Sequence, residues 1–225
     1  MDFAPGVAAA LRDAGRSFGP ARPAPPEPRW GALYAALDAA ADPHIVVAVE
    51  LIYEGYLLHY RESRAVLLEA GDLPTRLLAG DFFYARGLRG FAARGDADAV
   101  GLLARLMAAC SCLRSSQAPF AADDALWAYT MGGLAAQHAG AGPAVVDALF
   151  DEVDAALGGP DPADVAGSVE RAAGRLGLPD AEPLVRALAA VSEPASSGPA
   201  SAPGLAASPA PSPGAASTPT ADTGR

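Results

Sequence analysis

The amino-acid sequence predicts an all-α fold, and three observations support that class. Apolar residues recur at spacings of three and four along most of residues 30–192, and no segment there shows the alternating pattern of a half-buried strand. An aspartate precedes several of these periodic stretches and a glycine follows several of them, as at the two ends of α-helices. Hydrophobic residues make up 51% of the 225 residues, which is enough for the core of one domain.

Three parts of the chain differ in composition. Residues 1–29 are expected to form a short helix and a proline-rich connector, which would be a linker or an extended strap. Residues 30–192 carry the periodic pattern and form the helical domain. Residues 193–225 contain seven Pro and six Ser but no aromatic residue, so they cannot bury enough surface to offset the entropy lost on ordering. We therefore predict a disordered C-terminal tail.

Each expected helix has its own boundary signals. In chain order, helices are predicted over residues 5–15, 30–41, 43–62, 73–94, 96–117, 122–139, 143–157, 161–176 and 179–192. Aspartates that can cap an N-terminus precede four of them: Asp42, Asp72, Asp96 and Asp161. Glycines that can end a helix follow four of them: Gly95, Gly140, Gly158 and Gly177.

The three central helices have distinct apolar patterns. The helix over residues 43–62 is apolar around nearly its whole circumference, so we expect it inside the bundle, with Gly55 allowing a neighbour to approach closely. The helices over residues 73–94 and 96–117 each carry an apolar stripe and are joined by a short turn at Gly95. They are predicted to form an antiparallel pair.

Charge and hydropathy exclude several classes of partner. The formal net charge of -10 gives no electrostatic basis for binding nucleic acid or an anionic membrane. The longest uncharged run, Ala125 to Val146, is interrupted by Gln137, His138 and Pro143, so no transmembrane helix is predicted. The first residues lack the pattern of a secretory signal, and we expect a cytoplasmic protein.

The cysteines and the paired acids lack the spacing of metal ligands. Cys110 and Cys112 lack a second ligand pair for zinc and cannot readily form a disulfide within a helix, so we expect small buried apolar residues. Asp123 and Asp124 are expected to be a helix N-cap. A solvated acidic helix face is expected from a further group of residues: Asp147, Asp151, Glu152 and Asp154.

Two segments, Val47-Ala-Val-Glu-Leu-Ile-Tyr-Glu-Gly-Tyr-Leu-Leu-His59 and Leu78-Ala-Gly-Asp-Phe-Phe-Tyr-Ala-Arg86, resemble consecutive helices of the all-α trans-polyprenyl diphosphate synthases. The resemblance covers residues 43–117 and implies a truncated isoprenoid-synthase-like helical bundle. Members of that family hold Mg²⁺ and a diphosphate between two aspartate-rich motifs. Here Tyr60 and Arg61 replace the first aspartates, the second motif is missing, and all 16 basic residues are Arg, with no Lys. The resemblance therefore implies a protein with no catalytic, cofactor-binding or metal-binding residues and no cofactor.

Remnants of a site are expected beside the lost motif. The candidates for a vestigial site or tunnel are Glu54, His59, Tyr60, Arg61 and Asp81. A metal site formed by Glu50, Glu54, His59 and Glu62 is conceivable, but pairing of Glu50 and Glu54 with arginines is the simpler interpretation. Asp81 is interpreted as a hydrogen-bond acceptor in helix packing.

Two further groups of residues take a role from the resemblance. Arg29 resembles an N-terminal arginine of the family, although Pro26 stands where the family has a lysine. Six aromatic residues are expected either to line an isoprenoid tunnel or to pack in the core: Tyr53, Tyr56, Tyr60, Phe82, Phe83 and Tyr84.

The resemblance implies a function through a partner. The first hypothesis is a non-catalytic or regulatory subunit of a heteromeric polyprenyl diphosphate synthase in isoprenoid biosynthesis, including menaquinone side chains. Its partner would be a full-length synthase or a second copy, with Phe82, Leu88, Leu103 and Leu106 at the interface. The alternatives are a homodimer that binds a polyisoprenoid or another apolar ligand, and a divergent active transferase.

Overall fold

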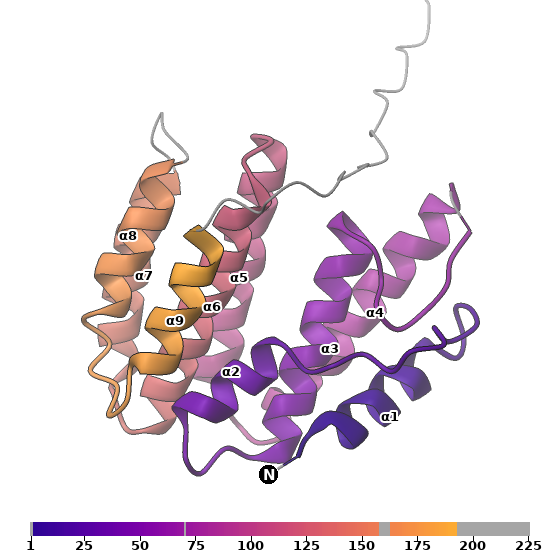
Figure 1. The fold of residues 1–225 in the computed structure, drawn as a ribbon, viewed down its shortest axis with the longest axis horizontal. Coiled ribbons are helices and arrows are strands. Elements are labelled where there is room, and N and C mark those ends of the chain that lie inside the picture. The colour runs from indigo at the N-terminus through magenta and orange to yellow at the C-terminus, as the bar shows by residue number, and fades with distance from the viewer. Residues whose placement is uncertain (1, 70, 158–162, 193–225) are drawn as a thin grey trace, which may run out of the picture. The chain divides into compact units, whose positions relative to one another are not determined.

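Helices account for nearly all regular structure in the computed structural model, which describes residues 2–69, 71–157 and 163–192 (Figure 1). They are α1 (Ala4–Gly15), α2 (Trp30–Leu37), α3 (Pro43–Tyr60), α4 (Leu73–Ala92), α5 (Ala97–Ser115), α6 (Phe120–His138), α7 (Pro143–Leu157), α8 (Ala163–Ala173) and α9 (Glu182–Ser192). Within these residues the only β-type pairing is an isolated bridge between Ala21 and Val66. The all-α prediction is confirmed. The prediction of a disordered tail falls on residues 193–225, outside the described part.

The predicted capping residues can be compared with the observed helix ends. Asp42, Asp72 and Asp96 each accept a hydrogen bond from a backbone N–H in the first turn of α3, α4 and α5, over 2.8–3.1 Å, as predicted. Glycines with positive φ follow α4, α6 and α8, also as predicted: Gly95, Gly140 and Gly177. The expectations for Asp161 and Gly158 lie outside the described residues.

Several helix ends differ from the prediction by up to four residues, and local structure explains two of the differences. The second helix ends at Leu37, four residues early, because Asp38 is extended and its carboxylate accepts the N–H of Ala40 over 2.9 Å. The sixth helix begins at Phe120, with Pro119 at the N-cap position. Asp123 and Asp124 therefore lie inside α6, and the prediction that they cap the helix is wrong.

The α3–α4 pair is the most extensive helix contact, whereas α5 packs mainly on α6. As predicted, α3 is buried from Ile45 to Leu58 apart from the half-buried Val47, and Gly55 allows close packing. A Cβ atom on Gly55 would lie 2.9 Å from the carbonyl oxygen of Gly80, and one on Gly87 would lie 2.7 Å from that of Ala48. The predicted antiparallel α4–α5 pair is only a minor contact, since α4 packs mainly on α3 and α5 mainly on α6.

The proline-rich connector before α2 forms an extended strap, defined here as residues 16–29. Its middle runs antiparallel to the segment after α3 and is held by two backbone hydrogen bonds, Arg22 N–H to Ala65 O at 2.9 Å and Leu67 N–H to Pro20 O at 2.8 Å. In Figure 1 the strap can be followed from α1 to the start of α2. The strap thereby brings Arg29 to the side of α3, where the candidate site lies.

Candidate functional site

Two buried glutamates of α3 anchor the strap and the segment that follows α3. Glu50 is completely buried, and its Oε1 accepts the backbone N–H groups of Arg29 and Gly31, each over 2.7 Å. Its Oε2 accepts from Arg64 Nη2 at 2.9 Å. The carboxylate thus caps the start of α2, where the first backbone N–H groups have no acceptor within the helix.

Glu54 lies one turn later on α3 and is also completely buried. Its Oε1 accepts from the Ser63 hydroxyl at 2.6 Å and from the N–H groups of Arg64 and Ala65 at 2.8 and 3.1 Å. Arg64 Nε lies 3.3 Å from Oε2. Pairing of both glutamates with an arginine was the simpler prediction, and it is confirmed. No group of three or more His, Cys, Asp or Glu in the described part of the chain is placed to hold a metal ion.

A second set of ion pairs joins the end of α3 to the start of α6. Asp124 Oδ2 lies 3.0 Å from Arg29 Nη2, and its Oδ1 lies 3.5 Å from Arg61 Nη1. Asp123 Oδ2 lies 2.5 Å from Arg114 Nη2 of α5. Arg61 therefore links the end of α3 to α6 by an ion pair.

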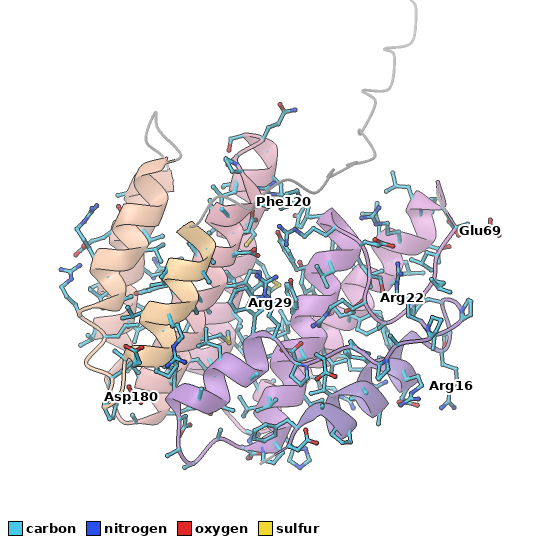
Figure 2. The ribbon with its side chains drawn as sticks, viewed as in Figure 1. Arg16, Arg22, Arg29, Glu69, Phe120 and Asp180 are labelled. Carbon is cyan, nitrogen blue, oxygen red and sulfur yellow. The ribbon has the colours of Figure 1, made fainter. Side chains whose placement is uncertain are left out.

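An aromatic ring completes this group, which we call the arginine–carboxylate cluster: Arg29, Glu50, Glu54, Arg61, Arg64, Arg114, Phe120, Asp123 and Asp124. The guanidinium carbons of Arg61 and Arg114 lie 4.2 and 4.0 Å from the centre of the Phe120 ring, within cation–π range. Four arginines face four carboxylates, so the cluster is formally neutral. Figure 2 labels Arg29 and Phe120, two members on different elements.

Asp123 is the electrostatically unusual member of the cluster. Burial raises the pKa of Asp123 to about 6, although Arg114 and the Cys110 thiol oppose this change. Arg114 is close, yet neither carboxylate oxygen of Asp123 has a well-aligned hydrogen-bond donor among the described residues. Nearby, the Tyr56 hydroxyl and the Trp127 indole N–H are buried and also lack a partner in the described structure. Burial also raises the pKa of the Cys110 thiol.

The remaining vestigial-site candidates, His59, Tyr60 and Asp81, are not part of the cluster. His59 Nε2 lies 3.1 Å from Asp81 Oδ1, and the His59 ring stacks on Tyr84 with 5.2 Å between centres. Burial lowers the pKa of His59, and Asp81 opposes this. Asp81 of α4 thus contacts a residue of α3, in line with the acceptor in helix packing that we expected, although its side chain is 73% exposed. Tyr60 packs between His59 and Tyr56.

The sequence interpretation thus identified part of the cluster. Of the five vestigial-site candidates, only Glu54 and Arg61 belong to it. It assigned Asp123 and Asp124 to a helix cap and did not assign Arg114 a role. One sequence signal was available, because the two aspartates stand within the apolar run Ala121-Ala122-Asp-Asp-Ala125-Leu126-Trp127, as charged groups in a buried helix do.

Most of the aromatic residues that were expected either to line a tunnel or to pack in the core pack in the core. Tyr53 and Tyr56 are buried and stack on each other, with ring centres 5.9 Å apart. Trp127 of α6 packs edge-on against both, and Trp30 stacks on Trp127 at 6.1 Å. These rings fill space between α2, α3 and α6.

Two adjoining grooves lie elsewhere, between α1 and the strap. Their volumes are about 440 and 170 Å³, and Arg12 and Ala21 line both. Arg16 lines the larger groove and Arg22 the smaller one, so the grooves carry basic side chains at one edge of the molecule. Figure 2 labels both arginines.

The predicted interface residues divide into buried and exposed ones. Leu103 and Leu106 are fully buried within the single chain, which corrects the expectation that they lie at an interface: their apolar stripe on α5 faces the core. Leu88 is partly buried. Phe82 is 40% exposed and packs on Phe18 of the strap, with 5.3 Å between ring centres.

Exposed large apolar side chains concentrate on α4. Seven such side chains occur in the described residues, and four belong to the first half of α4, which we call the α4 apolar surface: Leu73, Leu77, Leu78 and Phe82, exposed by 40–63%. Leu67 lies in the segment just before this helix, while Val145 and Val185 lie on α7 and α9. A concentration of this kind on one element is typical of an interaction surface.

Comparisons with known proteins found no matching family model, no matching curated protein and no matching solved structure. None of the described helices is both long enough and apolar enough to span a membrane.

Of the two cysteines, Cys110 is buried as predicted, whereas Cys112 is exposed, contrary to the prediction.

Proposed function

We propose that this chain is a non-catalytic subunit that binds a catalytically complete polyprenyl diphosphate synthase through the α4 apolar surface. The single observation that carries the proposal is the exposure of Leu73, Leu77, Leu78 and Phe82 on the helix that resembles an interface helix of that family. A stable interface buries about 800 Å² on each partner around an apolar centre. Four large side chains on one helix can supply such a centre.

The state of the arginine–carboxylate cluster supports a non-catalytic role. A prenyl transferase stabilises the departing diphosphate with Mg²⁺ ions held by free carboxylates. In this chain, Glu50 and Glu54 already accept seven hydrogen bonds between them, and Asp124 is engaged by Arg29 and Arg61. A carboxylate occupied in this way cannot bind Mg²⁺ without losing interactions that hold the fold.

A binding experiment tests the proposal. The chain would be co-expressed with a catalytically complete polyprenyl synthase from the same genome, and the mass of the complex measured by light scattering. Leu78→Arg and Phe82→Arg should each weaken the complex at least tenfold, because each places a charge at the centre of an apolar contact. Val185→Arg on α9 is the matched control, since Val185 is equally apolar and 57% exposed.

The outcomes separate the possibilities clearly. Circular dichroism would establish that each variant is folded. If the complex survives both α4 substitutions but dissociates with Val185→Arg, the interface lies on α9 and not on α4. A folded wild-type chain that binds no synthase would refute the subunit proposal, and labelled isopentenyl diphosphate incorporated by the purified chain alone would refute its non-catalytic part.

A second candidate function is a homodimer that binds a polyisoprenoid or another apolar molecule with a polar end. The buried, unpartnered hydroxyl of Tyr56 and indole N–H of Trp127 favour it, because buried polar groups without partners are costly and a ligand oxygen could pair with them. Mass spectrometry of lipids extracted from the purified protein would test it. Tyr56→Phe should release such a ligand, and a lipid-free wild-type protein would exclude this candidate.

A further inference from the structure

The two adjoining grooves between α1 and the strap differ from the rest of the molecule in their charge. Arg12 lines both grooves, Arg16 lines the larger one and Arg22 the smaller one, and among the described residues no aspartate or glutamate lines either. In the arginine–carboxylate cluster, by contrast, every arginine faces a carboxylate. The grooves contain no residue of that cluster or of the α4 apolar surface, so their role is independent of the proposed function.

The helix α1 presents one face to the grooves, and the strap forms the opposite wall. The residues of α1 and its C-cap that line them follow one another at helical spacings of three and four, and therefore share a face: Ala8, Arg12, Gly15 and Arg16. The strap lines the grooves with residues between Gly19 and Pro26. A ligand in the grooves would therefore contact two elements that are separate in the sequence.

Two of the three arginines are poorly neutralised. The Arg12 side chain has no carboxylate within ion-pair distance in the part of the chain that the structure describes. Arg16 Nη2 lies 3.6 Å from Asp13 Oδ1, but the other oxygen of Asp13 is engaged by Arg86 at 2.7 Å. Asp13 is thus shared between two arginines, and the larger groove retains positive charge.

Arg22 has one partner and one donor without an acceptor. Its Nη2 donates to Glu62, whose side chain is 82% exposed, whereas its Nε is buried and has no partner among the described residues. A buried N–H group without an acceptor costs stability, and an anion beside Arg22 would supply the acceptor. Counting Arg86, four arginines beside the grooves share only Asp13 and Glu62, in a chain whose net charge is -10.

The position of a helix end explains only part of this charge. Arg12 lies in the last turn of α1 and Arg16 is its C-cap residue, where cations interact favourably with the helix dipole. Arg22, however, belongs to the strap, and its charge reaches the smaller groove from the opposite wall. Figure 2 labels Arg16 and Arg22 on the same side of the molecule. The arginines therefore converge from two elements.

The other lining residues narrow the class of ligand. Apart from the arginines they are glycine, alanine, proline and valine, so no side chain in either groove can accept a hydrogen bond. A sugar or another ligand rich in hydroxyl donors would lack side-chain partners. Phosphate and carboxylate groups only need donors, and a guanidinium binds both with two parallel hydrogen bonds. The larger groove, about 440 Å³, has the size of a small-molecule site.

We propose that the two grooves bind a small polyanion, with Arg12 between them contacting its centre and Arg16 and Arg22 contacting its two ends. The ligand carries phosphate or carboxylate groups on a short aliphatic body, which lies against the buried side chains of Ala65 and Val66. Because the anion contacts both α1 and the strap, it stabilises the folded chain when it binds.

Titration calorimetry of the full chain tests the site, with inorganic tripolyphosphate and citrate as probes. The wild type should bind at least one of them, and a concentration about a hundredfold above the dissociation constant should raise the melting temperature by about 5 °C. Arg12→Gln should weaken binding about tenfold or more, because both grooves share this guanidinium. Tighter binding of tripolyphosphate would assign phosphate groups to the ligand, and tighter binding of citrate would assign carboxylates.

Arg89→Gln is the matched control. Arg89 is exposed on α4 and lines neither groove, so this variant loses the same charge and should bind both probes as the wild type does. Circular dichroism would establish that both variants are folded. Equal losses of affinity in the two variants would overturn the proposal, because they would show that the probes respond only to the net charge.

Amide NMR of the wild type provides a test that needs no variant. On addition of the tighter probe, the backbone signals of Gly15, Gly19 and Ala21 should shift most, since these residues line the larger groove. Shifts confined to the arginine–carboxylate cluster would place the anion elsewhere and overturn the proposal. So would a wild-type chain that binds neither probe.

Discussion

Glu54 and Asp123 are both completely buried carboxylates beside an arginine, yet their surroundings differ. Glu54 accepts a hydroxyl, two backbone N–H groups and the Nε of Arg64. Asp123 has Arg114 at 2.5 Å but no well-aligned donor among the described residues, and its pKa is raised to about 6. Burial alone therefore does not decide what a carboxylate does. The number and alignment of donors decide whether it is a fixed anchor or a group that responds to pH.

The largest effect is expected when the anchored carboxylate is removed. Glu54→Ala leaves the Ser63 hydroxyl and the backbone N–H groups of Arg64 and Ala65 without their acceptor, so it should lower the free energy of unfolding by about 3–5 kcal/mol. Urea unfolding followed by circular dichroism measures this. Glu62→Ala is the control, since the Glu62 side chain is 82% exposed and should cost less than about 1 kcal/mol. Equal losses in the two variants would show that Glu54 is not an anchor.

The next largest loss of stability is expected when Arg114, the partner of Asp123, is replaced. Arg114→Met keeps much of the packing on Phe120 but leaves Asp123 without its nearest cation. Because Asp123 can take up a proton instead, the loss should be about 2–3 kcal/mol at pH 8 and smaller at pH 5. Arg175→Met, on an exposed pair, should show no such pH dependence. A loss of equal size at both pH values would mean that Asp123 does not titrate in response.

The third effect is the pH dependence contributed by Asp123 itself. Its pKa is higher in the folded protein than the ordinary value of 3.8, so the folded state holds this proton more tightly and the contribution of Asp123 to stability falls as the pH rises from about 4 to 6. Asp123→Asn removes that dependence. Relative to wild type, the Asn variant should gain about 2 kcal/mol between pH 4 and pH 7.

Urea unfolding across this range measures the difference between the two proteins. Asp147→Asn is the control, because the Asp147 side chain is 54% exposed on α7 and its replacement should leave the profile parallel to that of wild type. Parallel profiles for Asp123→Asn would show that burial does not shift this carboxylate.

The sequence predicted the helices well because their signals are local. Asp42, Asp72 and Asp96 cap helices through contacts within three residues, and the glycines after α4 and α6 need only a permissive backbone. The pairing of α4 with α3 was missed because it depends on how closely glycines on two distant segments fit together. The apolar stripe of α5 is real, but the sequence alone does not show that Leu103 and Leu106 face α6 and the core and not a partner.

The candidate site was predicted only in part, because some of its signals are local and others depend on distant segments. Glu50 and Glu54 stand out as acids on an apolar helix, and their pairing with an arginine follows from the cost of burying a lone charge. The donors to Glu50 were not predicted, because the N–H groups of Arg29 and Gly31 come from a segment 19 or more residues away. Asp123 and Asp124 resemble a helix cap locally, and only the earlier start of α6 at Phe120 places them inside.

The smallest effect is expected for an ion pair of the same chemistry at the surface. Arg86 Nη2 of α4 lies 2.7 Å from Asp13 Oδ2 of α1, but the two side chains are 34% and 53% exposed. Water already solvates both groups and salt screens them, so Asp13→Asn should lower the free energy of unfolding by only about 0.2–1 kcal/mol. A double-mutant cycle with Arg86→Met would isolate the coupling between the two side chains. The coupling should shrink further in 1 M NaCl, whereas the Glu54→Ala penalty should not, because salt does not reach a carboxylate with no exposed surface. A coupling as large as the Glu54 penalty would show that the geometry of the pair, and not its burial, sets the energy of ion pairs in this protein.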